Sequence, residues 1–313
     1  MSRESHKKME WVLSGRVCSA FVLFGLTGLL SAPSHAATQT PARKLAVSWS
    51  VGWQPMPLVN GAPVVFRVGA PLALESLSGN WLGHDVPFSF EPRSRVWYAL
   101  AGVSLETTPG AYSLRLKGET AGGKEISFER QIAVRRAHYP SIAVTVGKQF
   151  TAPSPEQLQE INQDKTLKAD VFRHVDAKRQ WSGKFQPPVV ARVSDVFGTR
   201  RTFNGETRST HEGLDYAVPA GTPVSAVNGG TILLARSLFF EGNCVVLDHG
   251  QGLLTLYLHL SEFKVKEGEH VARGQVLGIS GGTGRATGPH LHVAVRWQGV
   301  YVNPATLLEL TFP

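Results

Sequence analysis

Three short motifs in the last third of the 313-residue chain carry side chains that could hold a metal ion. They are His211-Glu212-Gly213-Leu214-Asp215, Tyr257-Leu258-His259-Leu260 and His290-Leu291-His292. Two imidazoles and one carboxylate suit Zn²⁺ and leave a fourth coordination position open for water. The pKa of such a water falls to about 7, so it becomes a nucleophile near neutral pH. Further histidines nearby could pass protons or hydrogen-bond a developing oxyanion.

Strand geometry predicts how these histidines are presented. Successive side chains of a strand point to opposite faces, so His290 and His292 should share one face. In residues 254–260, leucine occupies every second position, while Tyr257 and His259 fall on the alternate positions. We therefore expect two strands that each present histidine on a polar face, opposite an apolar face.

His211 and Asp215 are four residues apart, a spacing that would bring them together on a helix. Gly213 within the motif and Pro219 shortly after it argue against a helix. A bent loop that leads into a strand would also bring the two side chains together. Each motif alone is weak evidence, but all three in this order, with glycine-rich loops between them, are strong evidence for a metal site.

At the level of these motifs, residues 193–304 resemble the lysostaphin/LytM-like peptidoglycan metalloendopeptidases. The motifs that carry the resemblance are, in chain order, Phe197-Gly198-x-Arg200-Arg201, His211-x-Gly213-Leu214-Asp215-Tyr216, Gly221-Thr222-Pro223-Val224, Leu247-Asp248-His249-Gly250, Tyr257-x-His259-Leu260, Gly282-Thr283-Gly284, Gly288-Pro289-His290-Leu291-His292 and Asn303-Pro304.

The resemblance implies a zinc-dependent endopeptidase that hydrolyses peptide cross-links of bacterial peptidoglycan, with the stem peptides as its substrate. It implies that His211, Asp215 and His292 bind one Zn²⁺ per chain. It also implies that His259 and His290 form the catalytic pair, which orients or activates the water and stabilises the tetrahedral intermediate. None of these five positions departs from the pattern of the family.

Two non-enzymatic interpretations compete with the endopeptidase. A catalytically inactive envelope protein that binds and activates cell-wall amidases would have lost metal ligands, whereas this chain retains them. Residues 265–275 resemble the half-barrel repeat of biotinyl/lipoyl carriers, but the modifiable lysine at a hairpin tip is missing. A GxSxG match at residues 278–282 does not predict a serine nucleophile, because the glycines after it oppose the helix that such a site needs.

The remaining pattern predicts a mainly β chain with two domains. Short alternating runs between turn signals in residues 37–150 predict a small immunoglobulin-like β-sandwich. Residues 151–185 predict a helical linker. Residues 186–313 return to strands and would form the antiparallel β zinc metallopeptidase domain.

The expected helix has a clear start. Ser154 can act as the N-cap, Pro155 fits the first helical position, and Gln157 completes a capping box. An apolar stripe at three- and four-residue spacing follows, made of Leu158, Ile161, Leu167, Val171, Phe172 and Val175.

Residues 1–36 predict a secretory signal peptide. A basic start precedes an apolar run of about 11 residues, shorter than the roughly 20 that span a bilayer. Ser34-His35-Ala36 fits a small-x-small cleavage pattern, so we expect cleavage after about Ala36 and export to the periplasm or cell envelope. Removal of Cys18 would leave only Cys244, which we interpret as a small buried hydrophobe.

The formal net charge of the chain is +8. Basic and acidic residues are equal in number from residue 186 onward, so the basic surplus lies in the N-terminal part. This surplus could attract anionic envelope polymers. The sequence contains no helix-turn-helix or zinc-finger motif, which argues against a nucleic-acid partner.

Overall fold

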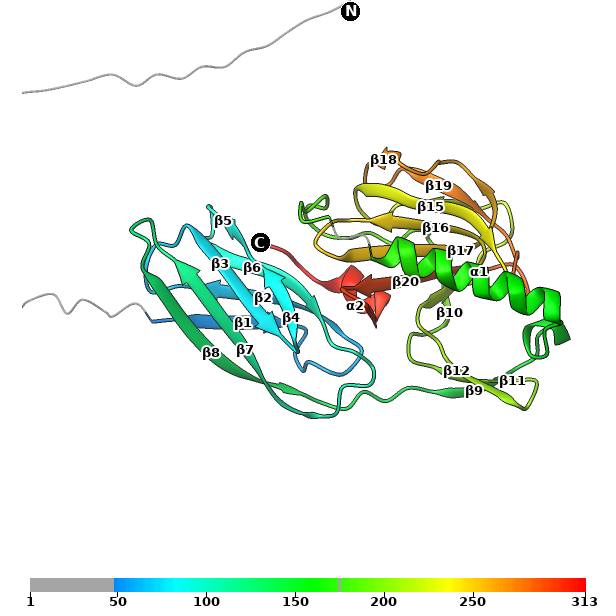
Figure 1. The fold of residues 1–313 in the computed structure, drawn as a ribbon, viewed down its shortest axis with the longest axis horizontal. Coiled ribbons are helices and arrows are strands. Elements are labelled where there is room, and N and C mark those ends of the chain that lie inside the picture. The colour runs from blue at the N-terminus through cyan, green and yellow to red at the C-terminus, as the bar shows by residue number, and fades with distance from the viewer. Residues whose placement is uncertain (1–47, 174–175) are drawn as a thin grey trace, which may run out of the picture. The chain divides into compact units, whose positions relative to one another are not determined.

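The structure is a computed structural model that describes residues 48–173 and 176–313 (Figure 1). The expected signal peptide, residues 1–36, and its cleavage site lie outside the described residues. Within the described part of the chain, no helix combines the length and the apolar character needed to cross a membrane. The described regular structure is mostly strand, so the mainly β fold class expected from the sequence is confirmed.

Two antiparallel four-stranded sheets form the N-terminal part of the described chain. The first has the order β1-β2-β6-β5, with the bounds Ser50–Gln54, Pro63–Gly69, Val96–Gly102 and Ser89–Glu91. The second has the order β4-β3-β7-β8, with the bounds His84–Pro87, Ser76–Trp81, Gly110–Glu119 and Glu125–Val134. The ring of Phe66 in β2 meets that of Trp81 in β3 edge-on, with centroids 5.3 Å apart, so the two sheets share one buried core.

A ten-stranded antiparallel sheet dominates the C-terminal part. Its main path is β10-β13-β20-β17-β16-β15-β18, and β14, β19 and β21 pair beside that path. The bounds are β10 Val193–Asp195, β13 Leu214–Tyr216, β14 Pro223–Ser225, β15 Gly230–Leu238, β16 Gly242–Asp248, β17 Leu253–Phe263, β18 His270–Val271, β19 Val276–Ser280, β20 Leu291–Trp297 and β21 Val300–Val302. The short helix α2 (Pro304–Glu309) follows β21.

Neighbouring strands of this sheet bury side chains on both faces. Tyr257 of β17 and Val293 of β20 are paired in register and lie in the larger buried cluster. Leu256 and Ala294 are also paired, and they lie in a second, smaller cluster on the opposite face. Cys244 is buried in this smaller cluster, as its apolar surroundings in the sequence predict.

Helix α1 (Pro155–Phe172) packs on the smaller cluster, and its first turn is the one that the sequence predicts. The Ser154 side chain accepts a hydrogen bond from the Gln157 backbone N–H, and the Gln157 side chain accepts one from the Ser154 backbone N–H. This reciprocal pair is a capping box, which satisfies two backbone donors that a helix start leaves free.

The predicted apolar stripe of α1 is only partly buried. Ile161 is buried, and three side chains pack on the smaller cluster, namely Leu167, Val171 and Phe172. Leu158, however, is 47% exposed. Val175 lies outside the described residues.

A three-stranded sheet leads into the motif that begins at His211. β9 (Ser141–Val144) pairs in parallel with β11 (Arg200–Phe203), and β11 pairs antiparallel with β12 (Thr207–Thr210). The 3₁₀ turn η1 (Lys148–Phe150) lies between β9 and α1. Because His211 follows β12 directly, this sheet determines where the first histidine of the motif lies.

Candidate metal centre

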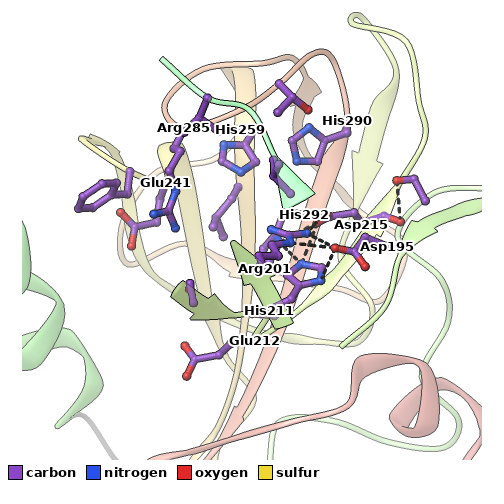
Figure 2. Close-up of a pocket in the computed structure, with 18 of the residues that line it drawn as sticks. Asp195, Arg201, His211, Glu212, Asp215, Glu241, His259, Arg285, His290 and His292 are labelled. Carbon is purple, nitrogen blue, oxygen red and sulfur yellow. Dashed lines mark hydrogen bonds and ion pairs between the residues drawn. The ribbon is translucent and has the colours of Figure 1, made fainter. Parts of the chain in front are cut away.

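A pocket of about 440 Å³ lies beside β12, β13 and the loop that precedes β20 (Figure 2). All five residues to which the sequence analysis gave a role line this pocket, namely His211, Asp215, His259, His290 and His292. Apolar side chains from β9 and β17 form other parts of its wall. The structure thus brings the three motifs, which are far apart in the sequence, around one cavity.

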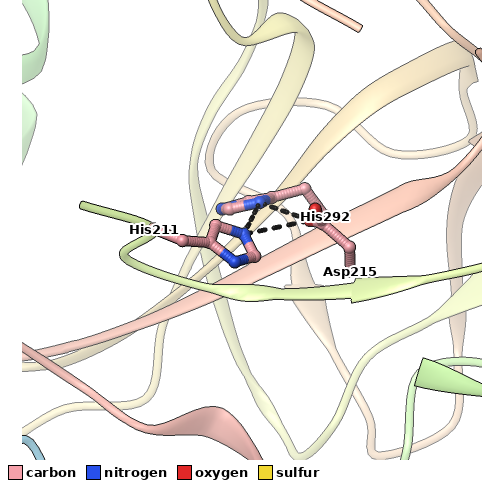
Figure 3. A group of neighbouring side chains, drawn as sticks. All are labelled: His211, Asp215 and His292. Carbon is pink, nitrogen blue, oxygen red and sulfur yellow. Dashed lines mark hydrogen bonds and ion pairs between the residues drawn. The ribbon is translucent and has the colours of Figure 1, made fainter. Parts of the chain in front are cut away.

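Three of these side chains direct one ligand atom each to a common point (Figure 3). His211 Nε2 lies 3.1 Å from Asp215 Oδ1 and 3.0 Å from His292 Nδ1. His292 Nδ1 lies 2.8 Å from Asp215 Oδ1. His211 is 3% exposed and Asp215 6% exposed, so the group is largely shielded from water.

The strand register explains why two of these residues meet. Asp215 in β13 is directly opposite His292 in β20. His211 reaches the same point from the bend between β12 and β13, which confirms the bent loop expected from the sequence instead of a helix. A bend of the chain, and not a helix, therefore brings the side chains of His211 and Asp215 together.

A backbone carbonyl fixes the tautomer of His211. Its Nδ1 donates to the carbonyl oxygen of Val196 at 2.9 Å, so its Nε2 presents a lone pair to the common point. Asp215 Oδ1 is also an acceptor there. Two acceptors at hydrogen-bond distance require a proton or a cation between them, and a metal-binding histidine ordinarily has its other nitrogen held in this way.

The carboxylate of Asp215 is held in its ionised form. Burial opposes ionisation, but the close contacts of the carboxylate with the imidazoles of His211 and His292 hold the pKa of Asp215 well below its usual range. Arg201 Nη2 adds an ion pair to Asp215 Oδ2 at 2.5 Å. The same guanidinium binds Asp195 Oδ2 through Nη2 at 2.6 Å and Nε at 2.8 Å.

Gly213 in the first motif leaves room for the imidazole ring of His292. A Cβ atom added at Gly213 would lie 2.3 Å from His292 Nε2 and 2.7 Å from the carbonyl oxygen of Val293. Neither contact is possible for a real side chain. Gly213 is therefore required by close packing against His292.

His259 and His290 form a second pair beside this group (Figure 2). Their ring centroids are 4.7 Å apart. His259 Nδ1 donates to the carbonyl oxygen of Thr283 at 2.8 Å, and His290 Nδ1 donates to that of Gly288 at 2.9 Å. Both rings therefore keep Nε2 free. Burial, and then the nearby His292 and His290, lower the pKa of His259 to about 3, so its ring is neutral.

The face on which His259 lies differs from the strand-alternation prediction. Leu258 and His259 of β17 together stand opposite the single residue Cys244 of β16, which makes a β-bulge. His259 has a φ of 63°, in the left-handed region. The bulge breaks the alternation, so His259 shares the pocket with Leu256 and Leu258.

Tyr257 does not share the pocket with His259. It is fully buried on the other face, where its hydroxyl accepts from the Val227 backbone N–H at 2.9 Å. His249 is also away from the pocket. Its Nδ1 donates to the Gly229 carbonyl oxygen at 2.7 Å, and its Nε2 lies 2.9 Å from Thr255 Oγ1. Both side chains therefore stabilise the fold through buried hydrogen bonds.

Sequence reasoning gave no role to Asp195 and Arg201. Asp195 Oδ2 lies 3.4 Å from His211 Nδ1 and also binds Arg201, so the two residues link two of the three converging side chains. The available signal was the Arg200-Arg201 pair in the first shared motif. The sequence does not show which of these two arginines faces inward.

A β-rich chain with three side chains that could hold a metal ion and two further histidines in one pocket fits the architecture of a metallopeptidase. Residues 209–304 match the model of peptidase family M23. A crystal structure of a peptidase M23 from Pseudomonas aeruginosa is 31% identical, covers 80% of this chain and 94% of that chain, and superposes with a TM-score of 0.60. The chain belongs to peptidase family M23.

Curated relatives match part of this chain. The peptidoglycan DD-endopeptidase ShyA of Vibrio cholerae is 39% identical over 163 residues, which is 50% of this chain and 34% of that protein. The DD-carboxypeptidase/endopeptidase Mpg of Neisseria meningitidis is 44% identical over 122 residues, which is 39% of this chain and 28% of that protein. The match thus spans about a third of the length of these relatives.

Proposed function

We propose that this protein is a zinc-dependent endopeptidase that hydrolyses peptide cross-links of bacterial peptidoglycan. The observation that carries the proposal is the convergence of His211 Nε2, Asp215 Oδ1 and His292 Nδ1 beside two further imidazoles. The relatives named as peptidoglycan DD-endopeptidases support the choice of substrate. Their names further suggest an amide bond between two D-configured centres.

The three donor atoms suit one Zn²⁺ per chain. Tetrahedral zinc with bonds of about 2.0–2.1 Å has ligand atoms roughly 3.3 Å apart, so the observed group needs to open by about half an ångström at most. Nitrogen and carboxylate donors without thiolate match the ligands that catalytic zinc takes. Bound zinc would polarise the scissile carbonyl and make water acidic at a fourth, open position.

The two other histidines would move the protons. In the neutral tautomers that the Thr283 and Gly288 carbonyls impose, Nε2 of His259 and of His290 is an acceptor. Nε2 of His290 can therefore take a proton from the attacking water, while Nε2 of His259, with its low pKa, can accept a hydrogen bond that orients this water. The resulting imidazolium would then donate from Nε2 to the tetrahedral intermediate or to the departing amine.

Hydrolysis of the cell wall would require export. We infer an envelope location, with residues 1–36 removed as a signal peptide after about Ala36, which N-terminal sequencing of the exported protein would test. We also propose the division into a sandwich (37–150), a linker (151–185) and a peptidase domain (186–313). The basic surplus of the N-terminal part would let it bind anionic envelope polymers.

Mass spectrometry of defined muropeptide dimers tests the proposal. The zinc-loaded protein should convert each dimer to two monomers whose summed mass exceeds that of the dimer by one water molecule. The masses of the monomers then identify the cleaved bond. A chelator should stop the reaction, and added Zn²⁺ should restore it. Dimers that stay intact with zinc-loaded protein would contradict the proposal and favour the alternative, a non-catalytic activator of cell-wall amidases.

A further inference from the structure

Two arginines line the pocket, and they differ in how their charge is balanced. Arg201 forms ion pairs with Asp195 and Asp215. Arg285 has no ion pair within 4.0 Å and no hydrogen bond from its guanidinium to any described residue. The nearby carboxylate of Glu241 pairs with Lys168 instead. Among the described residues, Arg285 is thus the pocket arginine without an ion pair, and the Glu241 carboxylate acts on its charge only from beyond that distance.

The backbone of Arg285 is fixed beside the catalytic pair. Its N–H donates to the Phe240 carbonyl oxygen at 2.9 Å, while the neighbouring Glu241 carbonyl accepts from the His259 N–H at 2.9 Å. A Cβ atom added at Gly284 would lie 2.3 Å from the Gly242 nitrogen, so the loop is pressed against this turn. Figure 2 shows Arg285 on the side of His259 away from His290.

Two aromatic rings hold the guanidinium in place. Its Cζ lies 4.7 Å from the ring centroid of Phe203 and 4.8 Å from that of Phe240. Such cation–π contacts orient the planar group but provide no hydrogen-bond acceptors for its five N–H donors. Burial lowers the pKa of Arg285, and the charge of Glu241, which forms no ion pair with it, offsets this only in part.

We propose that Arg285 binds a free carboxylate of the substrate, on the residue next to the scissile amide. This inference rests on the proposed function. A cross-link made through an amine of a diamino dicarboxylic acid leaves a carboxylate on the carbon that bears the scissile nitrogen. A guanidinium recognises such a group with two parallel hydrogen bonds, and an amide in its place removes the charge and one acceptor.

The test uses two synthetic cross-linked peptides that differ only at this carboxyl group. One carries the free acid and the other the primary amide. Wild-type protein should cleave the free acid with a kcat/KM about 10- to 100-fold higher, the usual effect of one charged hydrogen-bonded contact. Arg285→Gln should cleave both peptides at the rate of the amide, and Arg285→Lys should keep part of the preference.

The outcomes separate the two proposals. Cleavage of neither peptide by zinc-loaded wild type would contradict the proposed function itself. Equal cleavage of both by wild type, or an equal loss on both in Arg285→Gln with the preference unchanged, would overturn the role of Arg285. Arg236→Gln is a matched control, because Arg236 is outside the pocket and pairs with Glu267. Its preference should equal that of wild type, and zinc content should be the same in all variants.

Discussion

Arg201 holds the oxygen of Asp215 that faces away from the two imidazoles. Its Nη2 lies 2.5 Å from Asp215 Oδ2, while Asp215 Oδ1 lies 2.8 Å from His292 Nδ1. The two oxygens of one carboxylate therefore have different partners. Because Asp195 binds the same guanidinium, the orientation of Asp215 is fixed by the protein itself.

Replacing Arg201 should weaken metal binding. In Arg201→Gln, Asp215 loses the partner that orients it, so zinc affinity should fall by about 10- to 100-fold. Competition with a chelator of known affinity measures this change, and excess Zn²⁺ should restore activity. Arg200→Gln is the matched control, because Arg200 is exposed and lies one residue away. Equal zinc affinity in wild type and Arg201→Gln would show that Arg201 does not position the ligand.

Replacing Gly213 with alanine should also weaken zinc binding, in this case through a steric clash. The added Cβ of Gly213→Ala would overlap the ring of His292, which must then move away from the common point. We expect weaker zinc binding with an unchanged far-ultraviolet circular dichroism spectrum. Gly122→Ala, where a Cβ meets nothing within 4 Å, should bind zinc like wild type. Full zinc affinity in Gly213→Ala would rule out this packing constraint.

Replacing His259 should lower the rate of hydrolysis without loss of bound zinc. His259→Ala should keep its zinc and lose about 10²- to 10⁴-fold in kcat, the typical contribution of a general acid–base group. Zinc content and steady-state kinetics on muropeptide dimers give both quantities. A variant that loses its zinc together with its activity would mean that His259 is a ligand.

His249 should make stability depend on pH. Burial lowers the pKa of His249 to about 4, from its ordinary value of 6.5. The unfolded chain therefore takes up the proton first, so stability is complete above pH 6.5 and is lost as the pH falls towards 4. The full loss is about 3 kcal/mol.

Urea unfolding of the metal-free protein at several pH values measures this dependence. His249→Gln should be less stable than wild type at pH 7, because two hydrogen bonds of the ring are disturbed. Its stability should nevertheless vary less between pH 6.5 and 4. The same pH dependence in both proteins would assign the effect to other groups.

Several features of the fold could be predicted because they depend on local chemistry. The start of α1 follows from the capping residues Ser154 and Gln157. The bend between His211 and Asp215 follows from Gly213, which disfavours a helix. The convergence of the three motifs was expected from their residue types and the family resemblance. The register of β13 and β20 places Asp215 opposite His292.

Other features depend on tertiary contacts that no local pattern encodes. Alternation placed His259 with Tyr257, and the bulge opposite Cys244 reverses that arrangement. The inward orientation of Arg201 follows from its pairing with two acids that are distant in the sequence. The unpaired charge of Arg285 likewise emerges only when the loop packs against Phe203 and Phe240.

Elemental analysis of purified wild type and of His211→Ala tests the central claim most directly. The account predicts about one zinc per wild-type chain and almost none in His211→Ala, with the β-rich circular dichroism spectrum retained. His270→Ala, at an exposed histidine outside the pocket, should keep its zinc. If His211→Ala keeps stoichiometric zinc, the three converging side chains are not the metal site.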